Sequence, residues 1–237
     1  MNLATTLRFC QKPGEDIWAD RYCIVQGHFQ MALELGIGLN ALLNDCDIAP
    51  ICWQCAGLLI PGSATNIDPT YYGGAPFDPP EPADEYALDA KLIAHFLEAN
   101  KPILGICGGL QAINVFLGGT LKRVPGGDEV HCRKYPTQML RGDWIDYPMH
   151  RILIEKDSFV YDVFGTESAM VNSYHNWCID RLAPGLQVVA RSEDGIIEAV
   201  QWREKKIFAT QWHPELSFLI GDPVEKQLFA RFLRFCE

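Results

Sequence analysis

The chain has 237 residues, of which 48% are hydrophobic and 21% charged, and this length predicts one substantial core in a single domain over residues 1–237. The formal net charge is −10, and no run of basic residues is longer than Lys205-Lys206. Nucleic acid is therefore excluded as an expected partner, because nucleic-acid binders carry clustered basic faces. No apolar stretch is long enough to cross a bilayer, so no membrane association is expected.

The nine cysteines do not suggest a disulfide framework. The first ten residues, M-N-L-A-T-T-L-R-F-C, contain no long apolar segment and no processing site, so we expect no export. An odd number of cysteines without export favours a reducing compartment with free thiols, and we predict a cytoplasmic protein. Cys52 and Cys55 have C-x-x-C spacing, but no second ligand pair of the kind a structural zinc site needs is present. We interpret this pair as structural.

The first half of the chain contains apolar segments separated by turn residues. Residues 20–35 predict a helix that Gly36 ends, and 39–43 and 57–60 have the length and composition of strands. The Pro- and Gly-rich residues 64–84 predict a long loop, which either lines a pocket or packs on the core as a lid. Apolar residues then recur at helical spacing over 85–99.

The second half continues the alternation of strands and helices. Residues 102–106 predict a strand and 108–117 a helix, whereas 120–150 are expected to be irregular. Three further apolar stretches have strand length, at 151–154, 169–172 and 186–190. A hairpin pairing 196–202 with 207–212 is predicted across the turn R-E-K-K.

The last helix has a recognisable start. Asp222 is the predicted N-cap, Pro223 the first helical residue, and Glu225 the residue that reaches back in a capping box. Helices that alternate with short, wholly apolar strands predict an α/β fold, with a mostly parallel central sheet and helices on both faces. Such sheets place their chemistry at the carboxyl ends of their strands.

One strand ends in an unusual motif, G-I-C-G-G-L-Q, at residues 105–111. Gly105 and Gly109 flank Cys107 at the spacing of a nucleophile elbow, a sharp strand-to-helix turn that projects its apex side chain. The start of a helix favours the thiolate, and the N–H of Gly108 would face an oxyanion. Taken alone, the motif could equally contain an inert buried cysteine. The surrounding sequence must therefore decide between the two interpretations.

That context includes a base and a group to orient it. His213 follows an apolar strand in Q-W-H-P-E, and Glu215 lies two residues further on. This spacing lets the carboxylate hold one imidazole nitrogen while the other faces a thiol. A Cys107–His213–Glu215 catalytic triad is therefore predicted.

These motifs resemble the class I glutamine amidotransferase superfamily, and within it the γ-glutamyl hydrolase branch, peptidase C26. The same branch is similar in L-L-I-P-G-S-A-T-N-I-D-P-T-Y-Y-G-G, V-N-S-Y-H-N-W and S-E-D-G-I-I-E-A-V. The resemblance runs from about residue 20 to the end and implies a flavodoxin-like sheet. It also implies a thioester mechanism, in which Cys107 attacks the γ-carbonyl of a glutamyl amide and His213 protonates the departing amine.

The resemblance also implies an oxyanion hole and a substrate site. The N–H of Gly108 would form the oxyanion hole with that of Gly62 or Ser63. Four residues match positions at or beside the site of the glutamyl head, namely Gln111, Ser173, Tyr174 and His175. Many bacterial members carry arginine where Gly108 stands, and H-N-W at 175–177 is closer to folate-type γ-glutamyl hydrolases, so the amine product is not identified.

The expected partner is a small γ-glutamyl substrate, and a homodimer is the assembly considered. Two other functions stay open: a glutaminase subunit that feeds ammonia to a separate synthetase, and a thiol sensor on the same fold. No motif demands a metal or an organic cofactor. His131 and His150 lack paired spacing, and we expect them to be loop residues rather than metal ligands.

Overall fold

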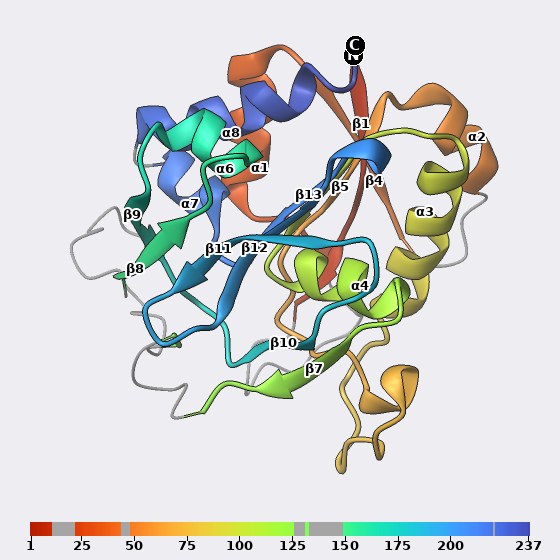
Figure 1. Cartoon of the computed structure of the whole chain (residues 1–237). Coiled ribbons are helices and arrows are strands. Elements are labelled where there is room, and N and C mark those ends of the chain that lie inside the picture. Colours follow the sequence, from red (N-terminus) through yellow and green to blue (C-terminus); the bar gives the residue numbers. More distant parts are fainter. Residues whose placement is uncertain (11–21, 44–47, 126–130, 133–148, 220) are drawn as a thin grey trace.

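The computed structural model describes residues 1–10, 22–43, 48–125, 131–132, 149–219 and 221–237. Its central feature is a nine-stranded sheet with helices on both faces (Figure 1). Five neighbouring strands are parallel, and in spatial order they are β4 (Gly38–Leu42), β1 (Asn2–Thr6), β5 (Gly57–Ile60), β6 (Ile103–Ile106) and β13 (Ile207–Thr210). The sheet continues with four antiparallel strands, β12 (Ile197–Trp202), β11 (Gln187–Ser192), β8 (Met149–Ile154) and β9 (Ser168–Asn172).

The parallel half has the strand order of a flavodoxin-like fold. Numbered by their place in the chain, its strands read 2-1-3-4-5 across the sheet, which is the order of that doubly wound class. The predicted α/β fold with a flavodoxin-like sheet is confirmed. The predicted hairpin is also confirmed, because β12 pairs antiparallel with β13 across a short 3-10 helix, η3 (Arg203–Lys205).

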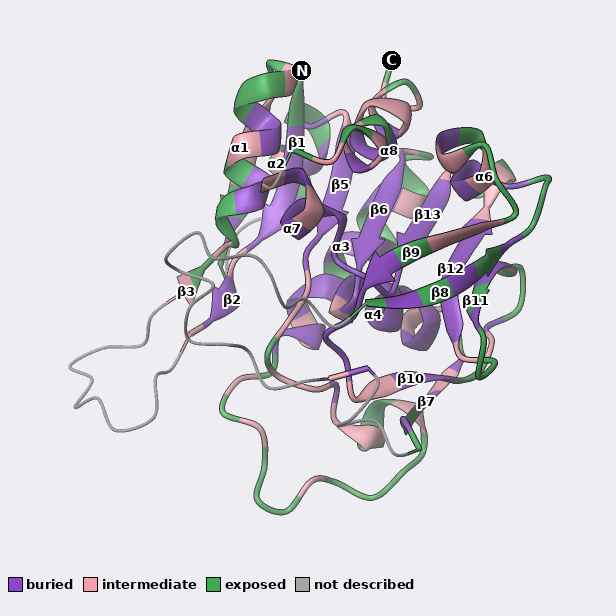
Figure 2. Ribbon diagram, turned by 90° about the vertical axis from the view of Figure 1, so that its left-hand side faces the viewer, coloured by how far each residue is buried: buried purple, intermediate pink, exposed green. Residues whose placement is uncertain are grey.

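The central strands are apolar on both faces because both faces are covered. In β5, Leu58 and Ile60 belong to one core cluster and Leu59 to the other, as the two-residue period of a strand requires. The first cluster lies under α2 (Ile48–Gln54), α3 (Tyr86–Glu98) and α4 (Gly108–Phe116). The second lies under α1 (Gln26–Leu35), α6 (Phe159–Phe164), α7 (Pro214–Leu219) and α8 (Pro223–Leu233). Figure 2 shows the central strands coloured as buried, as expected for a sheet with helices on both faces.

The N-terminal part differs from the prediction. The helix predicted over 20–35 begins only at Gln26, because Tyr22–Cys23 form β3, which pairs with β2 (Arg8–Phe9). Cys10 and Cys23 form a disulfide beside this pair. The expectation that all thiols are free is therefore wrong for these two cysteines.

The region predicted as irregular contains strands. β7 (Thr120–Arg123) pairs antiparallel with β10 (Trp177–Arg181) in a separate two-stranded sheet, and β8 begins at Met149. The rest of that prediction, residues 126–130 and 133–148, lies outside the described residues.

The long loop packs on this small sheet. It contains a 3-10 helix, η1 (Pro69–Tyr72), and the ring of Phe77 lies 5.5 Å from the ring of Trp177, edge to face. Of the two roles considered for residues 64–84, packing is therefore observed for the part around Phe77.

The start of the last helix is partly as predicted. Asp222 is the N-cap and accepts hydrogen bonds from the backbone N–H groups of Val224 and Glu225. The predicted contact of the Glu225 side chain back to the start of the helix is wrong. Its carboxylate instead accepts a 3.0 Å hydrogen bond from the indole of Trp212. Within the described part of the chain, no helix combines the length and apolar character that a membrane span requires.

Candidate active site

Cys107 occupies a strained turn between β6 and α4. Its φ of 50° and ψ of −102° lie in a region that residues other than glycine rarely adopt. A methyl group on Gly109 would lie 2.2 Å from the carbonyl oxygen of Ile60, and one on Gly105 would lie 2.7 Å from the carbonyl carbon of Gly109. The two glycines are therefore required by close backbone approach, as the elbow predicts.

His213 and Glu215 lie where β13 passes into α7. Nδ1 of His213 is 2.7 Å from Oε1 of Glu215, which is fully buried. Asn172, at the end of β9, accepts a 2.8 Å hydrogen bond from the backbone N–H of His213 and donates one of 2.8 Å to its carbonyl. Asn172 thereby fixes the backbone of the histidine, a role that its place in V-N-S-Y-H-N-W does not reveal.

Cys107 and His213 face the same small space. A methyl group built on Gly62 would lie 2.7 Å from Cε1 of His213 and 3.5 Å from Cβ of Cys107. Gln211 donates a hydrogen bond of 3.5 Å to the sulfur. Nε2 of His213 is buried and has no hydrogen-bond partner among the described residues. The second ring nitrogen is thus available on the side away from Glu215.

The electrostatics favour a charged imidazole. Burial alone would lower the pKa of His213, but the Glu215 carboxylate and the Cys107 sulfur raise it well above its ordinary value. Burial alone would raise the pKa of Glu215, and the neighbouring imidazole lowers it below its ordinary value. These shifts favour an imidazolium paired with a carboxylate, beside the sulfur of Cys107.

The backbone amide of Ser63 lies beside Gly108, the residue that follows Cys107. A methyl group on Gly108 would lie 3.0 Å from the backbone nitrogen of Ser63. Ser63 is held by Glu85, whose carboxylate accepts hydrogen bonds from the hydroxyls of Ser63 and, at 2.9 Å, of Thr65. Of the two candidates for the second oxyanion donor, Ser63 has its nitrogen beside Gly108.

A small hollow opens beside these amides. A buried ion cluster forms one wall, in which Arg8 Nη1 lies 3.0 Å from Asp89 Oδ2 and 3.8 Å from Glu85 Oε2. The lining residues come from β2, the loop after β5, the start of α3 and α4, and they are Arg8, Ser63, Thr65, Asn66, Ile67, Glu85, Tyr86, Asp89, Gly108 and Gln111. The start of the 64–84 loop therefore lines this hollow, although its later part packs elsewhere.

The predicted substrate residues separate into two groups. Gln111 lines the hollow, and the ring of Tyr174 lies 5.8 Å from the ring of His213. Ser173 donates a 3.0 Å hydrogen bond to the carbonyl of His131, and Nε2 of His175 lies 3.5 Å from Oε1 of Glu198. The side chains of Ser173 and His175 thus contact a cluster that the sequence analysis did not anticipate.

Comparison with known proteins agrees with the fold and the motifs. The family model of peptidase C26 matches residues 10–215. The chain belongs to the peptidase C26 family. It is 34% identical over 183 residues to the glutamine amidotransferase-like protein YvdE of Lactococcus lactis, covering 74% of this chain and 72% of that protein.

Other members and structural neighbours fit this peptidase C26 assignment. The γ-glutamyl-γ-aminobutyrate hydrolase of Escherichia coli O157:H7 is 32% identical over 185 residues, covering 76% of this chain and 72% of that enzyme. The crystal structure of a glutamine amidotransferase from Thermotoga maritima has the same fold, with a TM-score of 0.63 at 15% identity, covering 100% of this chain and 98% of that one. The chain is thus a glutamine amidotransferase-like hydrolase.

One interpretation of the histidines in this peptidase C26 protein needs correction. His150 is not a loop residue but lies on β8, whereas His131 lies in a loop as predicted, and the two are 9% and 1% exposed. His28 on α1, which no sequence motif marks, is also fully buried, and burial lowers its pKa although Glu215 acts to raise it. Their positions depend on contacts between distant segments, which spacing along the sequence does not reveal.

Proposed function

We propose that this C26 hydrolase cleaves the γ-glutamyl amide bond of a small molecule through a Cys107–His213–Glu215 triad. The observation that carries the proposal is the buried 2.7 Å contact between His213 Nδ1 and Glu215, with Cys107 close to the same ring. A nucleophile, a base and an orienting group at the ends of neighbouring strands are the parts that acyl transfer needs. The names of the related γ-glutamyl-γ-aminobutyrate hydrolases support a γ-glutamyl substrate.

The first half-reaction forms a thioester. The sulfur of Cys107 attacks the γ-carbonyl carbon, and the carbonyl oxygen takes the negative charge toward the N–H groups of Gly108 and Ser63. His213 gives its Nε2 proton to the amine nitrogen as the carbon–nitrogen bond breaks, and the amine leaves. Glu215 keeps the ring oriented and stabilises its charged form.

The second half-reaction releases glutamate. Neutral His213 takes a proton from a water molecule, whose oxygen attacks the thioester carbonyl at the same oxyanion site. The tetrahedral intermediate collapses and the carbon–sulfur bond breaks, so Cys107 leaves as a thiolate while His213 keeps the proton taken from water. This restores the starting pair, and the new carboxyl group of glutamate releases its proton to solvent. Gln111, which lines the hollow, is proposed to contact the glutamyl head.

A panel of γ-glutamyl amides tests this proposal. Glutamate release should be measured for glutamine, γ-glutamyl-γ-aminobutyrate and γ-glutamyl polyamines with wild type and Cys107→Ala. We expect turnover of at least one amide without a second protein, and a loss of about a thousandfold or more in the variant. Turnover that survives in Cys107→Ala would contradict the triad. Activity on glutamine alone, appearing only with an added synthetase, would favour the glutaminase alternative.

A further inference from the structure

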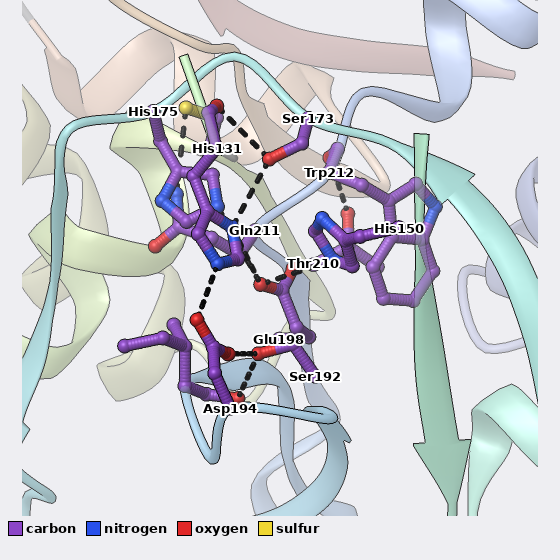
Figure 3. Close-up of polar contacts among 12 residues, drawn as sticks. His131, His150, Ser173, His175, Ser192, Asp194, Glu198, Thr210, Gln211 and Trp212 are labelled. Carbon is purple, nitrogen blue, oxygen red and sulfur yellow. Dashed lines mark hydrogen bonds and ion pairs between the residues drawn. The ribbon is translucent and has the colours of Figure 1, made fainter. Parts of the chain in front are cut away.

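Three histidines and a glutamate converge in the interior next to the proposed active site (Figure 3). They come from four segments: His131 from the loop after β7, His150 from β8, His175 from the turn between β9 and β10, and Glu198 from β12. Glu198 is fully buried, and the most exposed of the four, His150, is only 9% exposed. The proposed triad uses none of these side chains.

Their polar atoms surround one point. Oε1 of Glu198 lies 3.3 Å from Nε2 of His150, 3.5 Å from Nε2 of His175 and 3.7 Å from Nδ1 of His131. Candidate ligand atoms of His131, His150 and Glu198 all lie within 4.8 Å of one another. In a tetrahedral zinc site with metal–ligand distances of about 2.0–2.1 Å, neighbouring ligand atoms are roughly 3.3 Å apart. The separations of 3.3–3.7 Å between Glu198 and the three histidines are close to this spacing.

The outer hydrogen bonds orient two of the rings as metal ligands. Nε2 of His131 lies 2.9 Å from Oδ2 of Asp194, and Nδ1 of His175 lies 3.1 Å from the carbonyl oxygen of Trp177. Carboxylates and carbonyls only accept, so these nitrogens carry the protons. Each neutral ring then turns a lone pair toward Glu198. A carboxylate or carbonyl behind each liganding imidazole is the usual second layer of a metal site.

The polar atoms at the centre of the cluster lack the hydrogen-bond partners that buried polar atoms normally have. Both carboxylate oxygens of Glu198, Nε2 of His150 and Nε2 of His175 are buried without a hydrogen bond in the described part of the chain. A buried carboxylate that accepts no hydrogen bond is costly, and lone pairs of neutral imidazoles that face it at 3.3–3.7 Å add repulsion. A divalent cation at the centre removes both problems, because it binds the carboxylate and all the lone pairs.

We propose that His131 Nδ1, His150 Nε2, His175 Nε2 and Glu198 bind one zinc-type divalent transition metal ion. Imidazole and carboxylate ligands suit Zn²⁺, and four protein ligands close the coordination sphere, which is typical of a structural site. The proposed role is to fix the segment Ser173–His175. The backbone N–H of His175 and the hydroxyl of Ser173 both bond the carbonyl of His131, and Tyr174 between them packs on His213.

Metal stoichiometry and stability test this site without an activity assay. The full-length protein should be stripped with a chelator, titrated with ZnCl2 and analysed for bound metal and Tm. We expect about one equivalent of Zn²⁺ and a rise in Tm, because an ion that binds only the folded state stabilises it. Glu198→Gln, which preserves side-chain volume, should lose the bound ion.

Variants outside the inner ligands make the test specific. Asp194→Asn should weaken zinc binding about 10- to 100-fold through the His131 hydrogen bond, whereas Asp180→Asn, a surface pair with Lys122, should not. Cys107→Ser and the Cys52→Ser/Cys55→Ser double variant should retain the ion. Three results would overturn the site: no binding of Zn²⁺, Co²⁺, Ni²⁺ or Mn²⁺ by wild type, full binding by Glu198→Gln, or loss of the ion in Cys107→Ser.

Discussion

Nδ1 of His213 lies 2.7 Å from Oε1 of Glu215, although only Pro214 separates the two residues in the chain. The short link works because β13 ends before His213 and α7 begins at Pro214, which turns the carboxylate back under the ring. A proline is well suited to the first residue of a helix, where no N–H is needed. Local chain geometry therefore positions His213 and Glu215 relative to each other. Cys107, in contrast, follows a strand about a hundred residues earlier in the chain.

Replacing Glu215 should test how far catalysis depends on the orientation of the His213 ring, because the nucleophile Cys107 is left in place. Glu215→Gln preserves the volume but removes the charge that raises the pKa of His213. We expect kcat/KM to fall by about 10³- to 10⁴-fold, as for acids that orient a catalytic histidine. Kinetics on the best γ-glutamyl amide would measure this, with the exposed Glu204→Gln as the control. Equal rates for the two variants would show that Glu215 has no part in catalysis.

Cys107 should be the thiol most reactive toward alkylation at pH 6. The imidazolium of His213 places positive charge beside this sulfur, whereas burial raises the pKa of Cys178 to about 11 and that of Cys236 to about 12. We expect iodoacetamide to modify Cys107 about 100-fold faster than these two, as mass spectrometry of peptides would show. His213→Asn should remove most of that advantage. Uniform labelling of the thiols would show that His213 does not activate Cys107.

The motif residues of the site could be predicted because their chemistry is local. The glycines on either side of Cys107 indicate a crowded backbone turn, and the H-P-E spacing indicates an acid that orients the histidine. Both features can therefore be recognised from the sequence alone. Their convergence follows from parallel strands, whose carboxyl ends share one edge of the sheet. The central strands β5 and β6 were predictable from their composition, since G-L-L-I and I-L-G-I are wholly apolar.

The other parts depend on contacts that local pattern does not encode. β7 and β10 carry several polar residues and are defined by pairing with each other across more than fifty residues. The helix α2 contains Pro50, which a helix tolerates in its first turn. In the sequence alone, however, a proline suggests that a helix is interrupted. His131, His150, His175 and Glu198 have no regular spacing, so only the folded chain brings them together.

The buried acid Glu225 should make stability depend on pH. Burial raises its pKa to about 8, so between about pH 4.5 and 8 the folded state keeps a proton that the unfolded chain releases. The free energy of unfolding should therefore fall across this window, by a total on the order of a few kcal/mol, and level off above it. Glu225→Gln should remove this component and be more stable than wild type at pH 8. Urea denaturation from pH 5 to 9 would measure both, and identical slopes would contradict the assignment.

The crowded glycine of the elbow should not tolerate even a methyl group. Gly109→Ala would place Cβ 2.2 Å from the carbonyl oxygen of Ile60, a backbone atom that cannot move aside, and we expect a loss of about 3 kcal/mol. Gly36→Ala is the matched control, because its φ of 66° is strained but the space around it is open. That control should cost only about 1 kcal/mol. Urea midpoints would compare them, and equal losses would show that crowding is unimportant.

Glu85 should act as a positioning residue for the amide of Ser63. Its carboxylate accepts hydrogen bonds from the hydroxyls of Ser63 and Thr65 and thereby fixes the turn after β5. Glu85→Gln removes acceptor capacity, and we expect kcat to fall about 10- to 100-fold while KM changes much less, because the oxyanion forms only after binding. Glu98→Gln, at the exposed end of the same helix, is the control. A change in KM alone would instead assign Glu85 to substrate binding.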